Sequence, residues 1–384
     1  MRFISATQIF NGTKFLNADT VLVLDDNNQF IESVSKASLN EAQIEKHEGI
    51  ICPGFVNAHC HVELSYLYQH IQQKTGFTGF ASELMSKRFA FSQEEIEKSI
   101  IEAEEKMWNN GIVAVGDISN NNSSFGKKAG SKMHYHTFIE LISFNPDSAE
   151  KVFAAGKELQ EKLVNQSGTL APHAPYSVSA ALMKKTAEAC PENKPLTIHN
   201  QESSSENEFF VSGTGNVLDL YKNLNIDIPY FQASGKSSLQ TYLKNLPANR
   251  NLILVHNTFT TVEDIKFAED YSHKIYWCLC PNANLFIENS LPDVKLFTSG
   301  NCKMVIGTDS LASNHSLSIV DELNTLIHHF SWLETGDLLK WATSNGAKAL
   351  NMEDKAGGFI KGKNAGLNLI DRKLGRFEYC RKLA

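Results

Sequence analysis

The feature that most constrains the fold is an alternation of short apolar runs with helical segments, which extends from about residue 56 to residue 350. Strands that alternate with helices predict βα units and a parallel sheet. Eight runs have the texture of buried strands: FVNAHCHVEL, IVAVGDIS, YHTFIELIS, TLAPHAPYS, LTIHNQES, LILVHNTF, IYWCLCPN and MVIGTDSL. Eight βα units in about 250 residues are typical of a (β/α)8 TIM-like barrel, so the predicted fold class is α/β.

The helical segments carry their own start signals. Ser92 is followed three residues later by Glu95, which predicts a capping box at the start of SQEEIEKSIIEAEEKMWNN. Thr261 precedes acidic residues, which favour the positive end of a helix dipole. These signals support the assignment of the intervening segments to helices.

The two chain ends have a different texture. RFISATQIF, TVLVLDD and QFIESVS in residues 2–55 are short strand-like runs, and the last two flank a turn at Asn27-Asn28. Strand and turn residues return after residue 355 in GGFIKGKNAGLNLIDRKLG. We therefore expect residues 1–55 and 355–384 to form a small composite β-sandwich domain beside a barrel of residues 56–354.

Composition excludes several classes of protein. Hydrophobic residues are 42% and charged residues 21% of the chain, as in an ordinary globular protein. Lys and Arg total 36 against 43 Asp and Glu, so no basic excess is available to hold nucleic acid. The sequence has no signal-peptide pattern and no apolar stretch long enough for a membrane span. The seven scattered cysteines suit a reducing compartment, and we expect a cytoplasmic protein.

Five polar residues end or follow apolar strand-like runs and form the candidate site. His59 and His61 are two apart, so a strand would direct both imidazoles to the same face. His199, His256 and Asp309 end LTIH, LILVH and MVIGTD. The carboxyl ends of barrel strands are where catalytic residues gather, and imidazoles with a carboxylate suit zinc or iron. The alternative for the His59 and His61 pair is two hydrogen-bonded core histidines.

Other histidine and cysteine pairs have structural interpretations. His134 and His136 start the third predicted strand, at the face opposite to the candidate site, so we expect structural or surface roles. His328 and His329 are adjacent in a helical stretch and cannot face one site. Cys278-x-Cys280 lacks the second pair that a structural zinc site requires.

The ordered motifs PGFVNAHCH, HNQES, LVHN and GTDS resemble the amidohydrolase superfamily, and specifically its cytosine-deaminase, chlorohydrolase and aminohydrolase branch. HAPYSVS, CPNANLFI and GTDSLASN are similar to local motifs of that branch, and the resemblance extends over essentially the whole chain. The resemblance implies one divalent metal ion, Zn²⁺ or Fe²⁺, with four ligands: His59, His61, His199 and Asp309. The fourth predicted strand offers His173 where binuclear members have a carboxylated lysine, which favours a mononuclear site.

The resemblance also implies catalytic roles for Glu202, His256 and Asp309. Metal-bound hydroxide would attack the substrate, and Glu202 would shuttle the proton. Asp309 would orient the hydroxide, and His256 would stabilise the new oxygen. His173 is expected to orient the substrate. Glu63 either binds a substrate hydroxyl or ring nitrogen, or caps a loop.

The preferred function is therefore hydrolysis of carbon–nitrogen bonds other than peptide bonds, as hydrolytic deamination of an amino-substituted nitrogen heterocycle. HCHVELS resembles the group that acts on 6-aminopurine nucleosides. Opening of a cyclic amide, as in imidazolonepropionase, and hydrolysis of a triazine or carbon–halogen bond are alternatives. A third alternative is a metal-binding protein without catalytic activity. The complete set of metal-binding and catalytic candidates argues against it. The expected partner is a small molecule, with no nucleic acid and no membrane, and a homodimer is a possible assembly.

Overall fold

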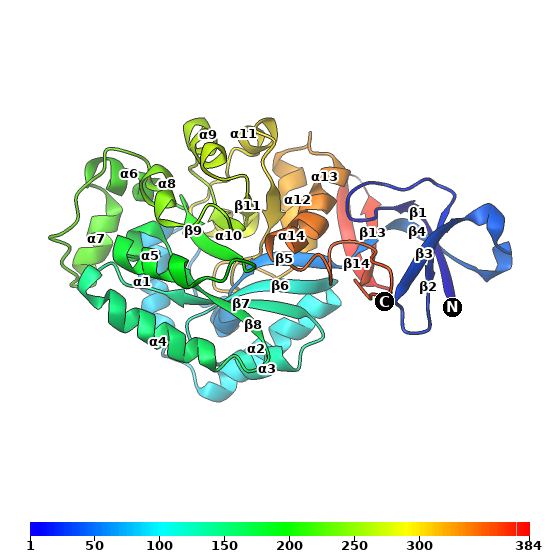
Figure 1. The fold of residues 1–384 in the computed structure, drawn as a ribbon, viewed down its shortest axis with the longest axis horizontal. Coiled ribbons are helices and arrows are strands. Elements are labelled where there is room, and N and C mark those ends of the chain that lie inside the picture. The colour runs from blue at the N-terminus through cyan, green and yellow to red at the C-terminus, as the bar shows by residue number, and fades with distance from the viewer. Residues whose placement is uncertain (374) are drawn as a thin grey trace.

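The computed structural model describes residues 1–373 and 375–384. A large α/β unit contains most of the chain, and a smaller sheet domain beside it contains both termini (Figure 1). Among the described residues, no helix has the length and apolar character needed to cross a bilayer.

Eight strands form the centre of the α/β unit, and each overlaps one of the eight runs identified in the sequence. They form two four-stranded parallel sheets, ordered β5-β6-β7-β8 and β12-β11-β10-β9. The strands are β5 (Phe55–Cys60), β6 (Ile112–Ser119), β7 (His134–Leu141), β8 (Ser167–Pro172), β9 (Leu196–Asn200), β10 (Leu252–His256), β11 (Ile275–Leu279) and β12 (Met304–Ile306).

The two sheets meet at both edges through residues near the carboxyl ends of their strands. Cys60 of β5 forms a parallel bridge with Asp309, which follows β12. On the other side, the His199 amide of β9 donates to the His173 carbonyl beyond β8, at 2.9 Å. Gly307 permits the first junction, because a Cβ there would lie 2.8 Å from the His59 Cβ. The strands thus have a barrel arrangement, although the described ladders do not form one continuous closed sheet.

Helices surround these strands (Figure 1). The predicted capping box at Ser92 and Glu95 is present, and Thr261 forms a second with Asp264. The α-helices are α1 (Gly76–Lys87), α2 (Gln93–Asn109), α3 (Phe125–Ala129), α4 (Ala149–Glu161), α5 (Ala180–Ala189), α6 (Ser204–Ser212), α7 (Asn216–Asn223), α8 (Ser238–Tyr242), α9 (Val262–Tyr271), α10 (Pro281–Ile287), α11 (Val294–Ser299), α12 (Ile319–His329), α13 (Thr335–Lys340) and α14 (Gly346–Ala349). Short 3-10 helices are η1 (Lys36–Ser38), η2 (Glu41–Gln43), η3 (Val62–Leu67), η4 (Pro146–Ser148), η5 (Pro175–Ser177) and η6 (Leu243–Asn245), and a π-helical turn is η7 (Trp341–Asn345).

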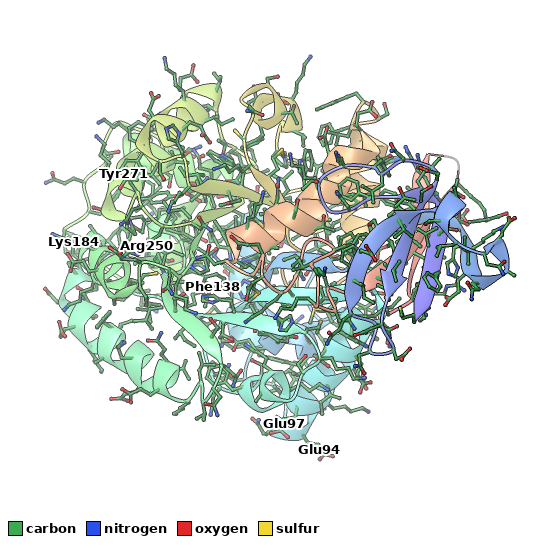
Figure 2. The ribbon with its side chains drawn as sticks, turned by 45° about the vertical axis from the view of Figure 1, so that its right-hand side comes forward. Glu94, Glu97, Phe138, Lys184, Arg250 and Tyr271 are labelled. Carbon is green, nitrogen blue, oxygen red and sulfur yellow. The ribbon has the colours of Figure 1, made fainter. Side chains whose placement is uncertain are left out.

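The apolar core has one large cluster between the strands and the helices and a second cluster inside the ring of strands. The second cluster draws residues from most strands, including Ala58, Ile118, Phe138, Val255 and Val305. Figure 2 shows Phe138 within the molecule, whereas Glu94 and Glu97 extend from α2 into solvent. Buried apolar packing therefore fills the base of the barrel and leaves the carboxyl ends of the strands for polar groups.

Both chain ends contribute to the smaller domain, as predicted. Its six strands are ordered β14-β13-β4-β1-β2-β3 and comprise β1 (Arg2–Ile9), β2 (Thr20–Leu24), β3 (Phe30–Ser35), β4 (Ile44–Pro53), β13 (Leu367–Lys373) and β14 (Arg376–Lys382). A sandwich of two sheets was expected, but these strands form one hydrogen-bonded sheet. The reason is β4, which pairs with β1 on one side and with β13 on the other. The predicted turn contains Asn28 at φ 58°, in the left-handed region.

Candidate active site

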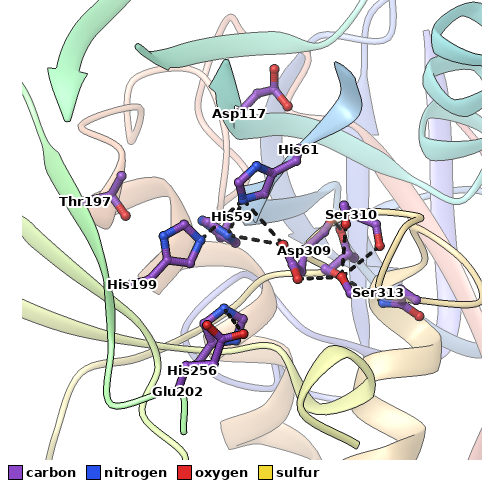
Figure 3. Close-up of polar contacts among 12 residues, drawn as sticks. His59, His61, Asp117, Thr197, His199, Glu202, His256, Asp309, Ser310 and Ser313 are labelled. Carbon is purple, nitrogen blue, oxygen red and sulfur yellow. Dashed lines mark hydrogen bonds and ion pairs between the residues drawn. The ribbon is translucent and has the colours of Figure 1, made fainter. Parts of the chain in front are cut away.

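Three imidazoles and one carboxylate converge where the two sheets meet (Figure 3). His61 Nε2 lies 3.2 Å from His59 Nε2 and 3.4 Å from His199 Nε2. Asp309 Oδ1 lies 3.4 Å from His61 Nε2 and 3.6 Å from His59 Nε2. All four residues are buried. The structure therefore brings together the four residues that the family resemblance suggested as ligands.

The spacing and charge of these four groups fit a divalent cation. Bonds of about 2.0–2.1 Å in a tetrahedral zinc site put neighbouring ligand atoms about 3.3 Å apart. Burial lowers the pKa of His61 to about 3 and lowers that of His199 as well, so both rings are neutral. Burial acts to raise the pKa of Asp309, but the nearby imidazoles of His59, His61 and His256 outweigh it, so this pKa is lowered. Neutral nitrogen lone pairs facing one carboxylate repel each other unless a cation lies between them.

Hydrogen bonds behind the ligands fix two of them. His199 Nδ1 donates to the His173 carbonyl at 2.8 Å, which leaves Nε2 free to bind a metal ion. Ser313 Oγ donates to Asp309 Oδ2 at 2.5 Å and so directs Oδ1 toward the histidines. Among the described residues, Nδ1 of His59 and of His61 has no such partner.

His256 and Glu202 lie beside this cluster. His256 Nε2 is 3.6 Å from Glu202 Oε1, and the His256 ring stacks on the His199 ring at a centroid distance of 5.4 Å. His256 Nδ1 is 2.9 Å from Asn284 Oδ1, an acceptor, so Nδ1 carries a proton, and Nε2 faces Glu202. Burial raises the pKa of Glu202 to about 7.

The turn that carries Glu202 is held by a second buried carboxylate, which sequence reasoning missed. Glu206 accepts the backbone N–H of Gln201 at 3.0 Å and of Glu202 at 3.3 Å. Gln201 has φ 47°, and His256 and Asp309 also have positive φ. Non-glycine residues with this left-handed backbone conformation are concentrated at functional sites, where the surrounding structure enforces the conformation.

The two expected substrate-binding residues have different surroundings. His173 lies beyond β8, with its ring centroid 4.9 Å from that of His199, and its Nδ1 is 2.5 Å from Ser177 Oγ. Burial lowers the pKa of His173 to about 4. Glu63, in η3, uses both carboxylate oxygens to accept the backbone amides of Asn120 and Asn121, at 3.0 and 3.3 Å. These contacts agree with the alternative in which Glu63 caps a loop.

Two further charged groups near the site were not singled out from the sequence. Glu140, on β7, places Oε1 3.7 Å from His199 Nδ1. Asp117, on β6, forms a buried ion pair with Lys128 and accepts the backbone N–H of Val62 at 2.8 Å, next to His61. A charged residue inside an apolar strand was the available signal for both Asp117 and Glu140.

The rejected candidates lie outside the cluster. His136 sits at the opposite end of β7, with Nδ1 2.9 Å from Ser167 Oγ and Nε2 3.0 Å from Thr169 Oγ1, as a structural histidine would. Cys278 and Cys280 are buried thiols packed in the inner apolar cluster.

Comparison with known proteins decides the family. The Amidohydrolase family model matches residues 50–380. The chain belongs to the amidohydrolase family. This family is metal-dependent, and the chain is a hydrolase that acts on carbon–nitrogen bonds. The predicted membership in its deaminase branch is confirmed by curated relatives.

These relatives share about a quarter of their residues with this amidohydrolase. An adenosine deaminase of Helicobacter pylori is 26% identical over 315 residues, which cover 79% of this chain and 75% of the relative. An aminodeoxyfutalosine deaminase of Nitratiruptor sp. is 27% identical over 365 residues, which cover 89% of this chain and 84% of the relative.

Solved structures confirm the barrel fold of this amidohydrolase. Helicobacter pylori aminofutalosine deaminase in complex with methylthio-coformycin superimposes with a TM-score of 0.79 at 22% identity, over 97% of this chain and 93% of that chain. An adenosine deaminase from Xanthomonas campestris with bound zinc superimposes with a TM-score of 0.76 at 20% identity, over 96% of this chain and 84% of that chain.

Proposed function

We propose that this chain removes the 6-amino group of an adenine-type nucleoside by hydrolysis, releasing ammonia and leaving the 6-oxo product. One divalent ion, zinc or iron, would be held by His59, His61, His199 and Asp309. The observation that carries the proposal is the convergence of three imidazole Nε2 atoms and Asp309 Oδ1 beside the buried pair of Glu202 and His256, 3.6 Å apart.

The residues around the cluster have complementary proton-transfer capacities. A bound divalent ion lowers the pKa of a coordinated water to about 7 and so supplies a nucleophile at neutral pH. Glu202 Oε1 accepts the proton of the attacking water and delivers it to a ring nitrogen and then to the departing amine. His256, whose Nε2 faces Glu202, would stabilise the oxygen that forms on the ring carbon. Asp309 remains ionised and orients that water.

His173 supports binding of an aromatic base beside the cluster. His173 uses Nδ1 to bond Ser177, so its Nε2 is available to orient the heterocycle. Relatives named adenosine, aminodeoxyfutalosine and 5′-deoxyadenosine deaminase, at 24–27% identity, favour a purine nucleoside over other heterocycles.

An ammonia-release assay on metal-loaded protein tests the proposal. The panel contains adenosine, 5′-deoxyadenosine, methylthioadenosine, cytosine, an amino-triazine and a cyclic amide. We expect ammonia and a 6-oxopurine product from at least one adenine nucleoside. Ammonia from cytosine or triazines alone would overturn the nucleoside assignment. Opening of the cyclic amide without any ammonia release would overturn deamination itself.

A further inference from the structure

Glu140 is a buried acidic residue at the site that has no role in the proposed reaction. It lies near the carboxyl end of β7, and its side chain is 4% exposed. One oxygen, Oε2, accepts the side-chain amide of Asn120 at 2.9 Å. The other, Oε1, lies 3.7 Å from His199 Nδ1, and Glu140, His173 and His199 form one compact group of polar atoms.

The Oε1 atom of Glu140 has unused acceptor capacity. The N–H of His199 Nδ1, 3.7 Å away, is already donated to the His173 carbonyl at 2.8 Å. Within the described part of the chain, no lysine or arginine forms an ion pair with Glu140. A carboxylate oxygen with a free acceptor position can accept a hydrogen bond from a ligand that supplies the donor.

The proposed substrate class limits what that donor can be. An adenine nucleoside has two kinds of hydrogen-bond donor, the 6-amino group and the sugar hydroxyls. The amino group is attached to the reacting carbon and must face the metal ligands and Glu202. Carboxylates commonly accept hydrogen bonds from ribose hydroxyls in nucleotide sites. The hydroxyls therefore remain as donors for a carboxylate outside the reaction centre.

Resting on the proposed function, we propose that Glu140 is a specificity-determining residue whose Oε1 accepts a hydrogen bond from a sugar hydroxyl of the nucleoside. The competing role is a positioning one, in which Glu140 only holds the His199 ring. The two roles differ in one measurable respect: the first depends on a hydroxyl of the substrate, and the second does not.

The test compares wild type with Glu140→Gln on adenosine, 2′-deoxyadenosine and 3′-deoxyadenosine. In the variant, the amide oxygen must accept from Asn120, so the NH2 group replaces the Oε1 acceptor. A hydrogen bond to a charged group corresponds to about 10- to 100-fold in kcat/KM. We expect wild type to prefer adenosine over one of the deoxynucleosides by about this factor, and the variant to lose that preference. Glu104→Gln is the matched control, since Glu104 is a buried carboxylate on α2 that pairs with Lys127.

Metal content and binding separate the possible outcomes. An equal loss of kcat/KM on all three nucleosides, or a lower metal content in Glu140→Gln, would assign Glu140 to His199 positioning and overturn the proposal. Calorimetric titration of the same nucleosides into metal-loaded Glu202→Gln protein, with and without Glu140→Gln, measures affinity without turnover. If wild type deaminates neither these three nor the other adenine nucleosides of the panel, the proposed function fails. This titration alone then decides Glu140, and equal affinities for all three nucleosides would overturn its assignment.

Discussion

Glu202 Oε1 and His256 Nε2 lie 3.6 Å apart, and both side chains are almost fully shielded from solvent. The two groups come from different strand ends, after β9 and at the end of β10. A carboxyl group whose pKa is raised to about 7, as that of Glu202 is, can exchange a proton at neutral pH. In the proposed function this pair would transfer protons, beside the four groups proposed to hold the metal ion.

Substitution of Glu202 tests this division of roles. Glu202→Gln keeps the size and polarity of the side chain but cannot carry the proton, so kcat should fall by about 10²- to 10⁴-fold. Metal content should stay at the wild-type level, because Glu202 is not among the converging ligands. Steady-state kinetics and elemental analysis measure the two effects, with Glu104→Gln as the control. Retention of more than half of the wild-type kcat would assign proton transfer to another group.

Removal of a ligand should instead remove the metal. Purified protein should contain close to one zinc or iron ion per chain, whereas His59→Ala and Asp309→Ala should lose most of it. Because a bound ion stabilises the folded state, chelation should lower the Tm of wild type and leave that of His59→Ala unchanged. His70→Ala, a change at an exposed ring, should behave as wild type. Two tightly bound ions per wild-type chain would contradict a mononuclear site.

The metal cluster could be predicted from the sequence because strand geometry determines it. Residues two apart on a strand share a face, and strand ends in a barrel meet at one rim, so local patterns predict that the candidate residues His59, His61, His199, His256 and Asp309 converge. The choice of four of them as metal ligands came from the family resemblance. Glu140 could not be assigned in this way, since its neighbours on β7 give no sign of which strand end or partner its carboxylate meets.

The contacts of Glu63 and the single end sheet were also beyond the local patterns. Glu63 accepts amides of Asn120 and Asn121, so its role depends on the path of a loop that is distant in sequence. The pairing of β4 with β13 joins segments at opposite ends of the chain. Long-range register of this kind is not encoded in a window of a few residues.

The ion pair of Asp117 and Lys128 should be important for stability. Both side chains are essentially inaccessible to solvent, and Asp117 also anchors the Val62 amide beside His61. Removal of one partner leaves a buried charge unpaired, so Lys128→Met should lower the free energy of unfolding by about 3–5 kcal/mol. The double variant Asp117→Asn, Lys128→Met should recover part of this loss. Urea unfolding measures both, and a loss below about 1 kcal/mol in Lys128→Met would show that the pair is dispensable.

The buried, neutral ring of His136 should make the free energy of unfolding depend on pH. Burial lowers its pKa from 6.5 to about 3 in the folded protein. Between these values the unfolded chain binds one more proton, so the free energy of unfolding falls as the pH falls, by up to about 1.4 kcal/mol per pH unit. The contribution of the neutral ring is fully present above pH 6.5 and is lost progressively toward pH 3.

His136→Gln should remove this one-proton dependence while an amide keeps a donor and an acceptor for Thr169 and Ser167. Urea unfolding between pH 4 and pH 7 should therefore show a shallower slope for His136→Gln than for wild type. The difference should reach about 3 kcal/mol over that range. His328→Gln, on the exposed face of α12, should keep the wild-type slope. Parallel slopes for wild type and His136→Gln would mean that the His136 ring is protonated, or solvated, in the folded protein.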